Sequence, residues 1–286
     1  MNYNWTKEWM KRVQRDYESI TLETAWGRTA LLAKNHERTD LTPIFFIPGF
    51  RTCGIFWDIN GTLSSLYDNY RIYLLDVLGQ PGLSHHHAPS VRSIDYGLWL
   101  REVLDHLELE TVNVAGVSFG GFLVFKLAQV ANDRIQRAFV CNPVGLRMIR
   151  VNWTIAYYNA LPYLSTTNKS IQQFLEKVII NDPKILEGQT RQHIVEYIKN
   201  TIKYDQLRTD YPYRYSDREL QALQAETHLI VDAEDTFINQ VATQKRAKKV
   251  LPNLKGIHQV KGVGHGLEFV EAPILYMKSV IEGKGE

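Results

Sequence analysis

Cysteine is nearly absent from this chain: Cys53 and Cys141 are the two cysteines among 286 residues. Their spacing matches no metal-binding motif, and two cysteines in a chain of this length do not make a disulfide framework. The sequence therefore predicts a fold held together by its hydrophobic core. It also favours a reducing, cytoplasmic location.

The chain also lacks a strong net charge and a long apolar run. Its formal net charge is +2, whereas nucleic-acid-binding domains are usually strongly basic on one face. No stretch approaches the roughly 18 uninterrupted apolar residues of a membrane span, and the charged N-terminus has no apolar core typical of a secretory signal. We expect no nucleic-acid partner and no membrane span. The basic run at 245–249 is interpreted as the solvated face of a helix.

What the sequence does contain is an alternation of strand-like and helical patterns. A hairpin is predicted at Trp26-Gly27, and buried strands are predicted in "PIFFI", "YRIYLLDV", "TVNVAGV" and "IQRAFVC". Amphipathic helical patterns stand between the later strands. Such alternation predicts an α/β fold with a mostly parallel central sheet flanked by helices.

The alternation stops after Pro143 and returns at "THLIVDAED". Residues 146–222 have helical patterns and hold eight of the fifteen tyrosines. We therefore predict a core made of residues 1–145 and 223–286, with an inserted helical lid over 146–222. Most of these tyrosines are expected to pack the lid onto the core, and Asp217 is expected to cap the last helix of the lid.

The segment "GVSFG" (116–120) places one serine between a predicted strand and a predicted helix. It fits G-x-S-x-G, in which a strained turn lifts the serine hydroxyl above the sheet edge. Side chains at the two glycines would collide with the neighbouring strand or helix. The same turn puts the amide of Phe119 at a helix N-terminus, where it can face a developing oxyanion. Ser118 is thus the candidate nucleophile.

A serine nucleophile needs a base and an acid that orients the base. Of the nine histidines, His265 alone follows a strand pattern and precedes the final helix, in the glycine-lined stretch "GVGHG". In "VDAED" the strand end offers Asp232, Glu234 and Asp235 as acids. The residues themselves leave these three open.

Several other residues are of types that could take part in the chemistry. The amide of Phe50, after Pro48-Gly49, is a candidate second oxyanion donor, with a plain Gly-Pro loop as the alternative. Cys53 is a rival nucleophile by residue type, but it lies on no such turn. Asp76 precedes the serine and is interpreted as a loop-holding residue. The three histidines at 85–87 are interpreted as a solvated loop, because consecutive residues cannot all face one metal ion.

Taken together, these residues resemble the α/β-hydrolase superfamily over residues 19–281. The landmarks occur in order: "PGF", "FW" at 56–57, "YRIYLLDVLGQPGLS", "GVSFGG", "VDAED" and "GVGHGLEFVEAP". The chain is similar in particular to small bacterial carboxylesterases with a helical lid. In that family pattern the acid stands three residues after a glycine, and Asp232 occupies the glycine position. The resemblance therefore implies Asp235 as the acid, with Asp232 and Glu234 as fallbacks.

The resemblance implies a serine hydrolase, expected to be a carboxylesterase acting on small to medium acyl esters. Ser118, His265 and Asp235 would form the triad, with the Phe50 and Phe119 amides as the oxyanion hole and with no cofactor or metal. The family's oxyanion loop commonly begins His-Gly, and here it begins Pro48-Gly49. Open alternatives are acyl transfer, lactone or amide hydrolysis, C–C bond hydrolysis, perhydrolysis, a non-catalytic ligand-binding protein, and a lid that serves as a protein-interaction surface. The oligomeric state is left open.

Overall fold

The computed structural model describes residues 2–150, 152–204 and 210–284. Its strands are β1 (Glu18–Thr24), β2 (Gly27–Lys34), β3 (Thr42–Ile47), β4 (Tyr70–Leu75), β5 (Val112–Val117), β6 (Ile135–Cys141), β7 (Glu226–Asp232) and β8 (Leu254–Val260). Its helices are α1 (Tyr3–Val13), α2 (Asp95–His106), α3 (Phe119–Ala131), α4 (Trp153–Leu164), α5 (Asn168–Phe174), α6 (Gly188–Tyr204), α7 (Asp217–Gln221), α8 (Gln240–Val250) and α9 (Glu271–Ile281).

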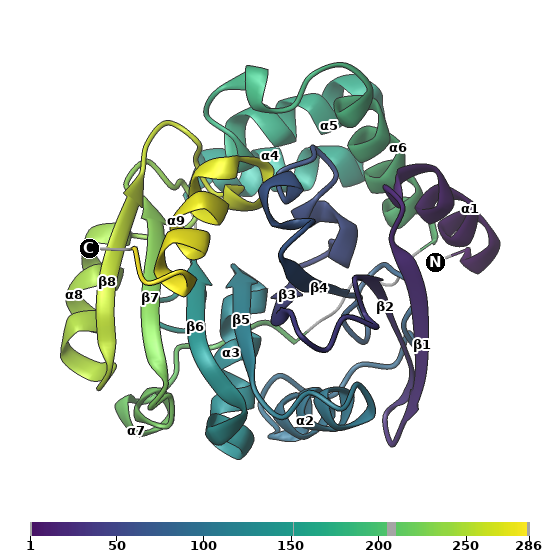
Figure 1. The fold of residues 1–286 in the computed structure, drawn as a ribbon. Helices are drawn as coiled ribbons and strands as arrows, with labels where there is room; N and C mark the ends of the chain where they lie inside the picture. The colour runs from purple at the N-terminus through teal and green to yellow at the C-terminus, as the bar shows by residue number, and fades with distance from the viewer. Residues whose placement is uncertain (1, 151, 205–209, 285–286) are drawn as a thin grey trace.

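One sheet runs through the molecule in the order β1-β2-β4-β3-β5-β6-β7-β8 (Figure 1). The β1–β2 and β2–β4 pairs are antiparallel, and every pair from β4 to β8 is parallel. The prediction of a mostly parallel α/β sheet is confirmed, as is the hairpin at Trp26-Gly27. The parallel strands all point their carboxyl ends to the same edge.

The sheet is buried on both faces, as the continuous apolar runs predict. In β3, Phe45 and Ile47 belong to the hydrophobic core on the side of α2 and α3. Ile44 and Phe46 belong to the core on the side of α1 and α9. This alternation follows from the two-residue period of a strand. The central strands are therefore fixed from both sides, and their ends form a rigid platform.

The N-terminal helix α1 was not expected from the sequence. It buries Trp9, Met10 and Val13. The Trp9 ring lies 5.0 Å from the ring of Tyr197 in α6, measured between centroids, and 6.4 Å from that of Phe56. Charged residues surround these apolar positions in the sequence. For this reason the sequence did not predict a helix with a buried face here.

Between β6 and β7 the chain forms α4, α5, α6 and α7, and the first three lie beyond the carboxyl ends of the central strands (Figure 1). A helical insertion at 146–222 was predicted, and residues 151 and 205–209 of it lie outside the described ranges. As expected, most of the eight tyrosines there contact the core. Tyr163 lies against Arg51, Tyr197 against Trp9 and Phe56, Tyr211 against Phe50, and Tyr213 and Tyr215 against Phe122. Tyr197 and Tyr215 are fully buried, but Tyr157, Tyr163, Tyr204 and Tyr211 are exposed.

The cap of α7 also differs from the prediction. Ser216 is the N-cap: its hydroxyl accepts from the amide of Glu219, whose carboxylate in turn accepts from the amide of Ser216. Asp217 is the first helical residue instead. A serine with a glutamate three residues later makes this reciprocal pair, which satisfies two of the amides at a helix start.

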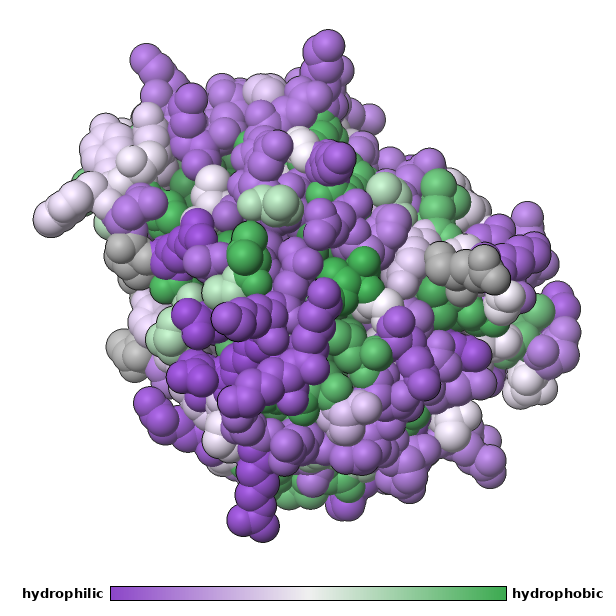
Figure 2. All heavy atoms as spheres, turned by 90° about the vertical axis from the view of Figure 1, so that its left-hand side faces the viewer, coloured by the Kyte–Doolittle hydropathy of each residue, from purple (hydrophilic) through white to green (hydrophobic). Residues whose placement is uncertain are grey.

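The basic run at 245–249 lies on α8. Lys245, Lys248 and Lys249 are exposed, on a face where hydrophilic side chains predominate (Figure 2). Arg246 departs from the predicted solvated face, because it is buried. Its guanidinium donates to the carbonyls of Leu146 at 2.6 Å and Tyr215 at 2.5 Å, and it pairs with Asp217 at 2.9 Å. One side chain thus holds both ends of the helical insertion against α8.

Replacing Arg246 with methionine should lower the free energy of unfolding by about 3 kcal/mol, because two carbonyls lose a charged donor. Thermal and urea unfolding monitored by circular dichroism would measure this loss. Lys249→Met on the same helix is the matched control and should change stability by less than about 0.5 kcal/mol. Equal unfolding of the two variants would contradict the role assigned to Arg246.

Within the described ranges, no helix has both the length and the apolar character that crossing a membrane requires.

Candidate active site

The residues singled out from the sequence lie at the carboxyl ends of neighbouring parallel strands. Phe50 follows β3, Ser118 follows β5, Asp235 follows β7 and His265 follows β8. Crevices at this edge of an α/β sheet are the usual place for a binding site. The order of the strands therefore brings together side chains that are far apart in the sequence.

Ser118 stands on a strained turn between β5 and α3. Its φ is 53° and its ψ is −109°, a conformation that non-glycine residues rarely adopt. A Cβ at Gly120 would lie 2.1 Å from the carbonyl oxygen of Ile47, and one at Gly116 would lie 2.4 Å from the backbone of Gly120. The collisions expected from the motif are therefore present, and glycine is required at both positions.

A chain of hydrogen bonds links the serine, the histidine and one carboxylate. His265 Nε2 lies 2.9 Å from Ser118 Oγ, and His265 Nδ1 lies 3.0 Å from Asp235 Oδ2. The carboxylate is fully buried and the imidazole is largely buried. An imidazole placed in this way can accept the hydroxyl proton while the carboxylate stabilises the resulting cation.

Electrostatics around His265 favour its protonated form overall. Burial disfavours the imidazolium, but the charge and hydrogen bond of Asp235 outweigh burial, so the pKa of His265 is raised above its ordinary value of 6.5. Glu268 is a second buried carboxyl near this imidazole, and burial raises its pKa to about 7. No sequence pattern singled out Glu268.

Among the three possible acids, only Asp235 contacts the imidazole within the described residues. Asp235 Oδ1 also accepts from the amides of Phe237 at 2.7 Å and Ile238 at 3.2 Å. Asp232 Oδ2 accepts instead from the amides of Val263 at 2.6 Å and Gly264 at 2.9 Å. Asp232 thus holds the loop that carries the histidine.

Glu234, the other fallback acid, lies on the surface. It is exposed, and its carboxylate accepts from the side chain of Asn181 at 3.3 Å. The helical insertion reaches the histidine loop nearby, because the carbonyl of Ile179 accepts from the amides of His265 and Gly266, each at 2.9 Å. The insertion therefore helps to position His265.

Asn142, directly after β6, joins the loops of the acid and the histidine, and it was not predicted as a site residue. Its side-chain nitrogen, Nδ2, donates to the carbonyls of Gly264 at 3.0 Å and His265 at 3.2 Å. Its side-chain oxygen accepts from Gln240 Nε2 at 3.0 Å, and the same Nε2 donates to Asp235 Oδ2 at 2.8 Å. Asn142 is buried with a φ of 39°, a left-handed value that asparagine tolerates. The sequence signal that could have identified this residue is an asparagine directly after a central strand.

The loop after β3 lies against the serine turn. A Cβ at Gly49 would be 3.8 Å from Ser118 Cβ, and the rings of Phe50 and Phe119 meet edge to face at 5.7 Å. Asp76 holds this region, because its carboxylate accepts from the amides of Gly54 at 2.8 Å and Leu83 at 2.7 Å. The interpretation of Asp76 as a loop-holding residue agrees with these bonds. Burial raises the pKa of Asp76 to about 6.

The rival candidates are placed away from this chemistry. Cys53 is fully buried, and burial raises the pKa of its thiol well above the ordinary value, which makes it a poor nucleophile. The histidines at 85–87 are exposed. In the part of the chain that the structure describes, no group of three or more His, Cys, Asp or Glu side chains is arranged to hold a metal ion.

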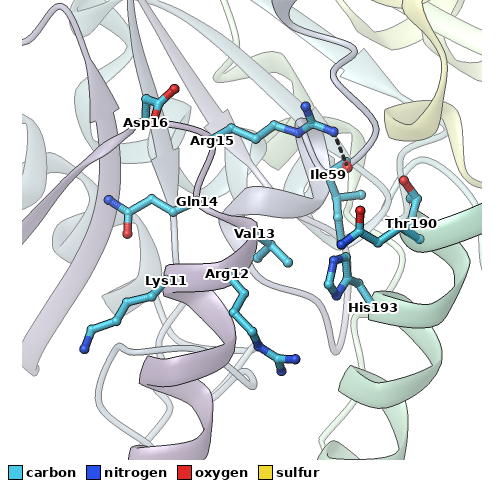
Figure 3. A pocket seen from close by; sticks show the side chains of 10 residues that line it. Lys11, Arg12, Val13, Gln14, Arg15, Asp16, Ile59, Thr190 and His193 are labelled. Atoms are coloured by element: carbon cyan, nitrogen blue, oxygen red, sulfur yellow. Dashed lines mark hydrogen bonds between the residues drawn. The ribbon is translucent and has the colours of Figure 1, made fainter.

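A surface hollow of about 560 Å³ lies between α1 and α6, and its lining residues include Arg12, Arg15 and His193 (Figure 3). Ser118 does not line it. Arg12 is paired with Glu196 at 2.7 Å, and Arg15 donates to the carbonyl of Ile59 at 3.0 Å. The two guanidinium groups are thus used to hold the two helices and the neighbouring loop together.

Known proteins share this architecture. A family model described as alpha/beta hydrolase fold matches residues 42–270. Carboxylesterase YbfK of Bacillus subtilis is 24% identical over 259 residues, which cover 87% of this chain and 81% of that protein. Its crystal structure superposes with a TM-score of 0.78 at 22% identity, covering 98% of this chain and 95% of the other.

A second solved structure, naproxen esterase (carboxylesterase NP) of Bacillus subtilis, has a TM-score of 0.79 at 20% identity and covers 98% of this chain and 96% of its own. The chain thus resembles small bacterial carboxylesterases, as the sequence landmarks predicted. Because the family model spans most of its length, the chain belongs to the alpha/beta hydrolase fold family.

Proposed function

We propose that this protein is a serine hydrolase, and specifically a carboxylesterase that acts on small to medium acyl esters. The observation that carries the proposal is the hydrogen-bonded chain from Ser118 through His265 to Asp235. A strained serine turn is the second support, because it exposes the hydroxyl at the sheet edge. Two curated relatives, both named as carboxylesterases, point to the same reaction class.

In the proposed mechanism, Ser118 Oγ attacks the acyl carbonyl while His265 Nε2 takes its proton. The imidazolium then protonates the leaving alcohol, and an acyl-enzyme forms. Water, deprotonated by the same imidazole, attacks the acyl group and releases the acid and the free serine. Asp235 holds Nδ1–H and stabilises the imidazolium through both steps.

The amides of Phe50 and Phe119 would bind the oxyanion. Phe119 begins α3, and the first amides of a helix have no partner within that helix. Phe50 follows the loop that lies against Ser118. Loss of one such donor typically costs about 3 to 4 kcal/mol of barrier. Pro48 in place of the family's usual histidine leaves the Phe50 amide available.

Residues 146–222 would act as the lid, and aromatic rings near the serine would receive the acyl group. The amide of Arg150 donates to the carbonyl of Phe237 at 2.6 Å, which fastens the insertion to the acid loop. The Phe237 ring lies 4.8 Å from the imidazole of His265, and the Phe50 ring lies 6.1 Å from that of Tyr211. Such surroundings suit a compact apolar acyl group better than a polymer.

Labelling with a fluorophosphonate tests the proposed function directly. Intact mass spectrometry should show a single adduct on the native chain, because an activated serine forms a stable phosphonate ester. Ser118→Ala and His265→Ala should show none. An adduct that persists in Ser118→Ala would place the reactive group elsewhere, and no adduct on the native chain would argue for a ligand-binding protein.

The pH dependence of ester hydrolysis should follow His265. Protonated His265 cannot accept the serine proton, so kcat/KM should fall about tenfold per pH unit in acid, with a midpoint above 6.5 because the pKa of His265 is raised. Glu268→Gln removes a negative charge that favours the imidazolium, so its midpoint should be lower. A native profile that stays flat down to about pH 5 would exclude His265 as the base.

A further inference from the structure

Helix α4 is unusual because it is apolar on its outer face as well as on its inner face. No charged residue occurs anywhere in 151–168. The buried residues of α4 are Ile155 and Pro162, and they mark the side that faces the protein. A helix on the surface of a soluble domain normally carries charged side chains on the opposite side.

The outer face holds a continuous apolar line that we call the α4 stripe: Trp153, Tyr157, Ala160 and Leu164. Their spacing of four, three and four residues places them on one side of the helix. Trp153 is 92% exposed, Tyr157 56% and Leu164 78%. Exposed apolar patches of this kind mark sites where a protein contacts another protein or a membrane.

The charges that flank the stripe are all positive. Arg147 and Arg150 precede α4 and Lys169 follows it, and all three are exposed. No aspartate or glutamate occurs between residues 143 and 175. Along the chain the stripe is therefore flanked by cations alone, which are complementary to an anionic partner.

A second copy of the chain fits this pattern poorly. In a symmetric antiparallel pairing of two stripes, Arg147 and Arg150 of one copy would face Lys169 of the other, and 143–175 offers no carboxylate to offset the repulsion. An anionic bilayer surface avoids this conflict. Tryptophan and tyrosine also favour the headgroup region, where apolar and polar surroundings meet.

We propose that the α4 stripe docks this protein on anionic lipid surfaces. Helix α4 has 12 residues, or about 18 Å, which is too short to span a bilayer of about 30 Å. It would lie in the plane of the interface, with the stripe at the boundary between headgroups and acyl chains and with Arg147, Arg150 and Lys169 at the phosphates. The docking needs no chemistry at Ser118, so Ser118→Ala should bind like the native chain.

Flotation of the full-length protein with vesicles tests the docking. Binding to phosphatidylcholine vesicles that contain phosphatidylglycerol should be about tenfold tighter than binding to phosphatidylcholine alone, should weaken with added salt, and should shift tryptophan emission to the blue. The double variant Trp153→Ser/Leu164→Ser should bind about tenfold more weakly or worse. Arg147→Gln/Arg150→Gln should lose most of the preference for phosphatidylglycerol.

Val241→Ser on α8 is the matched control, because Val241 is 75% exposed and lies on a lysine-bearing helix outside the insertion. It should bind as the native chain does, and circular dichroism should show all variants folded. The proposal is overturned if the native chain does not float with the anionic vesicles, or if Trp153→Ser/Leu164→Ser floats equally well. Dimerisation that this double variant abolishes, without vesicle binding, would assign the stripe to a second copy.

Discussion

Replacement of Ser118 by alanine should lower kcat/KM for ester hydrolysis by about four to six orders of magnitude, to the level left by binding and the proposed oxyanion amides. The reason is geometric. The hydroxyl lies 2.9 Å from His265 Nε2, on a turn that the close contacts of Gly116 and Gly120 hold in place. Alanine keeps this backbone and removes only the attacking oxygen. Steady-state hydrolysis of a chromogenic acyl ester measures the loss.

Cys53→Ala is the matched control for the nucleophile. Cys53 is the rival by residue type, but it is fully buried with a raised thiol pKa. Its replacement should leave kcat/KM within a few-fold of the native value. Hydrolysis that survives Ser118→Ala and is lost in Cys53→Ala would reverse the assignment of the nucleophile.

Asp235→Asn should reduce kcat by about three to four orders of magnitude while the fold is retained. Asp235 Oδ2 accepts from His265 Nδ1 and from Gln240 Nε2, and Oδ1 accepts from two backbone amides. An asparagine must turn its NH₂ group toward a donor in either orientation. With the NH₂ group toward His265, the imidazole loses the acceptor that fixes its tautomer. With the oxygen toward His265, the imidazolium still loses the charge of the carboxylate, and two backbone amides face a donor.

Two neighbouring variants separate Asp235 from the other acids of the same loop. Glu234→Gln alters an exposed carboxylate and should leave kcat within a few-fold of the native value. Asp232→Asn disturbs the loop that carries His265, so activity and thermal stability should fall together, with a smaller loss of kcat than in Asp235→Asn. A larger effect of Asp232→Asn or Glu234→Gln than of Asp235→Asn would move the acid to that residue.

Much of the architecture follows from local signals in the sequence. Apolar runs that alternate with amphipathic patterns predict a parallel sheet, and "GVSFG" predicts a turn whose glycines the structure shows to be required. The choice of acid was harder. Asp232, Glu234 and Asp235 are of similar residue type and lie within four positions, so local pattern cannot rank them. Their separation depends on how the loop folds against the histidine loop.

Features that depend on distant contacts were missed for the same reason. Arg246 lies in a run of cations, but its side chain is buried because it binds the carbonyls of Leu146 and Tyr215, which are about 100 and 30 positions away in the sequence. Asn142 looks like an ordinary loop residue until the strands are placed in order. The buried face of α1 depends on Phe56 and Tyr197, which no local pattern connects to Trp9.

The contacts of Arg246 with Leu146 and Tyr215 hold the two ends of the insertion at one place, which affects how the insertion can change during evolution. The entry and exit of the insertion are neighbours: the amide of Tyr215 donates to the carbonyl of Gly145 at 2.9 Å, and both ends bind the same guanidinium. A segment whose two ends already touch can grow, shrink or be exchanged with little cost in loop closure. We therefore expect the segment between Leu146 and Tyr215 to be exchangeable, so that a new insertion could change the acyl specificity while the sheet and its loops stay unchanged.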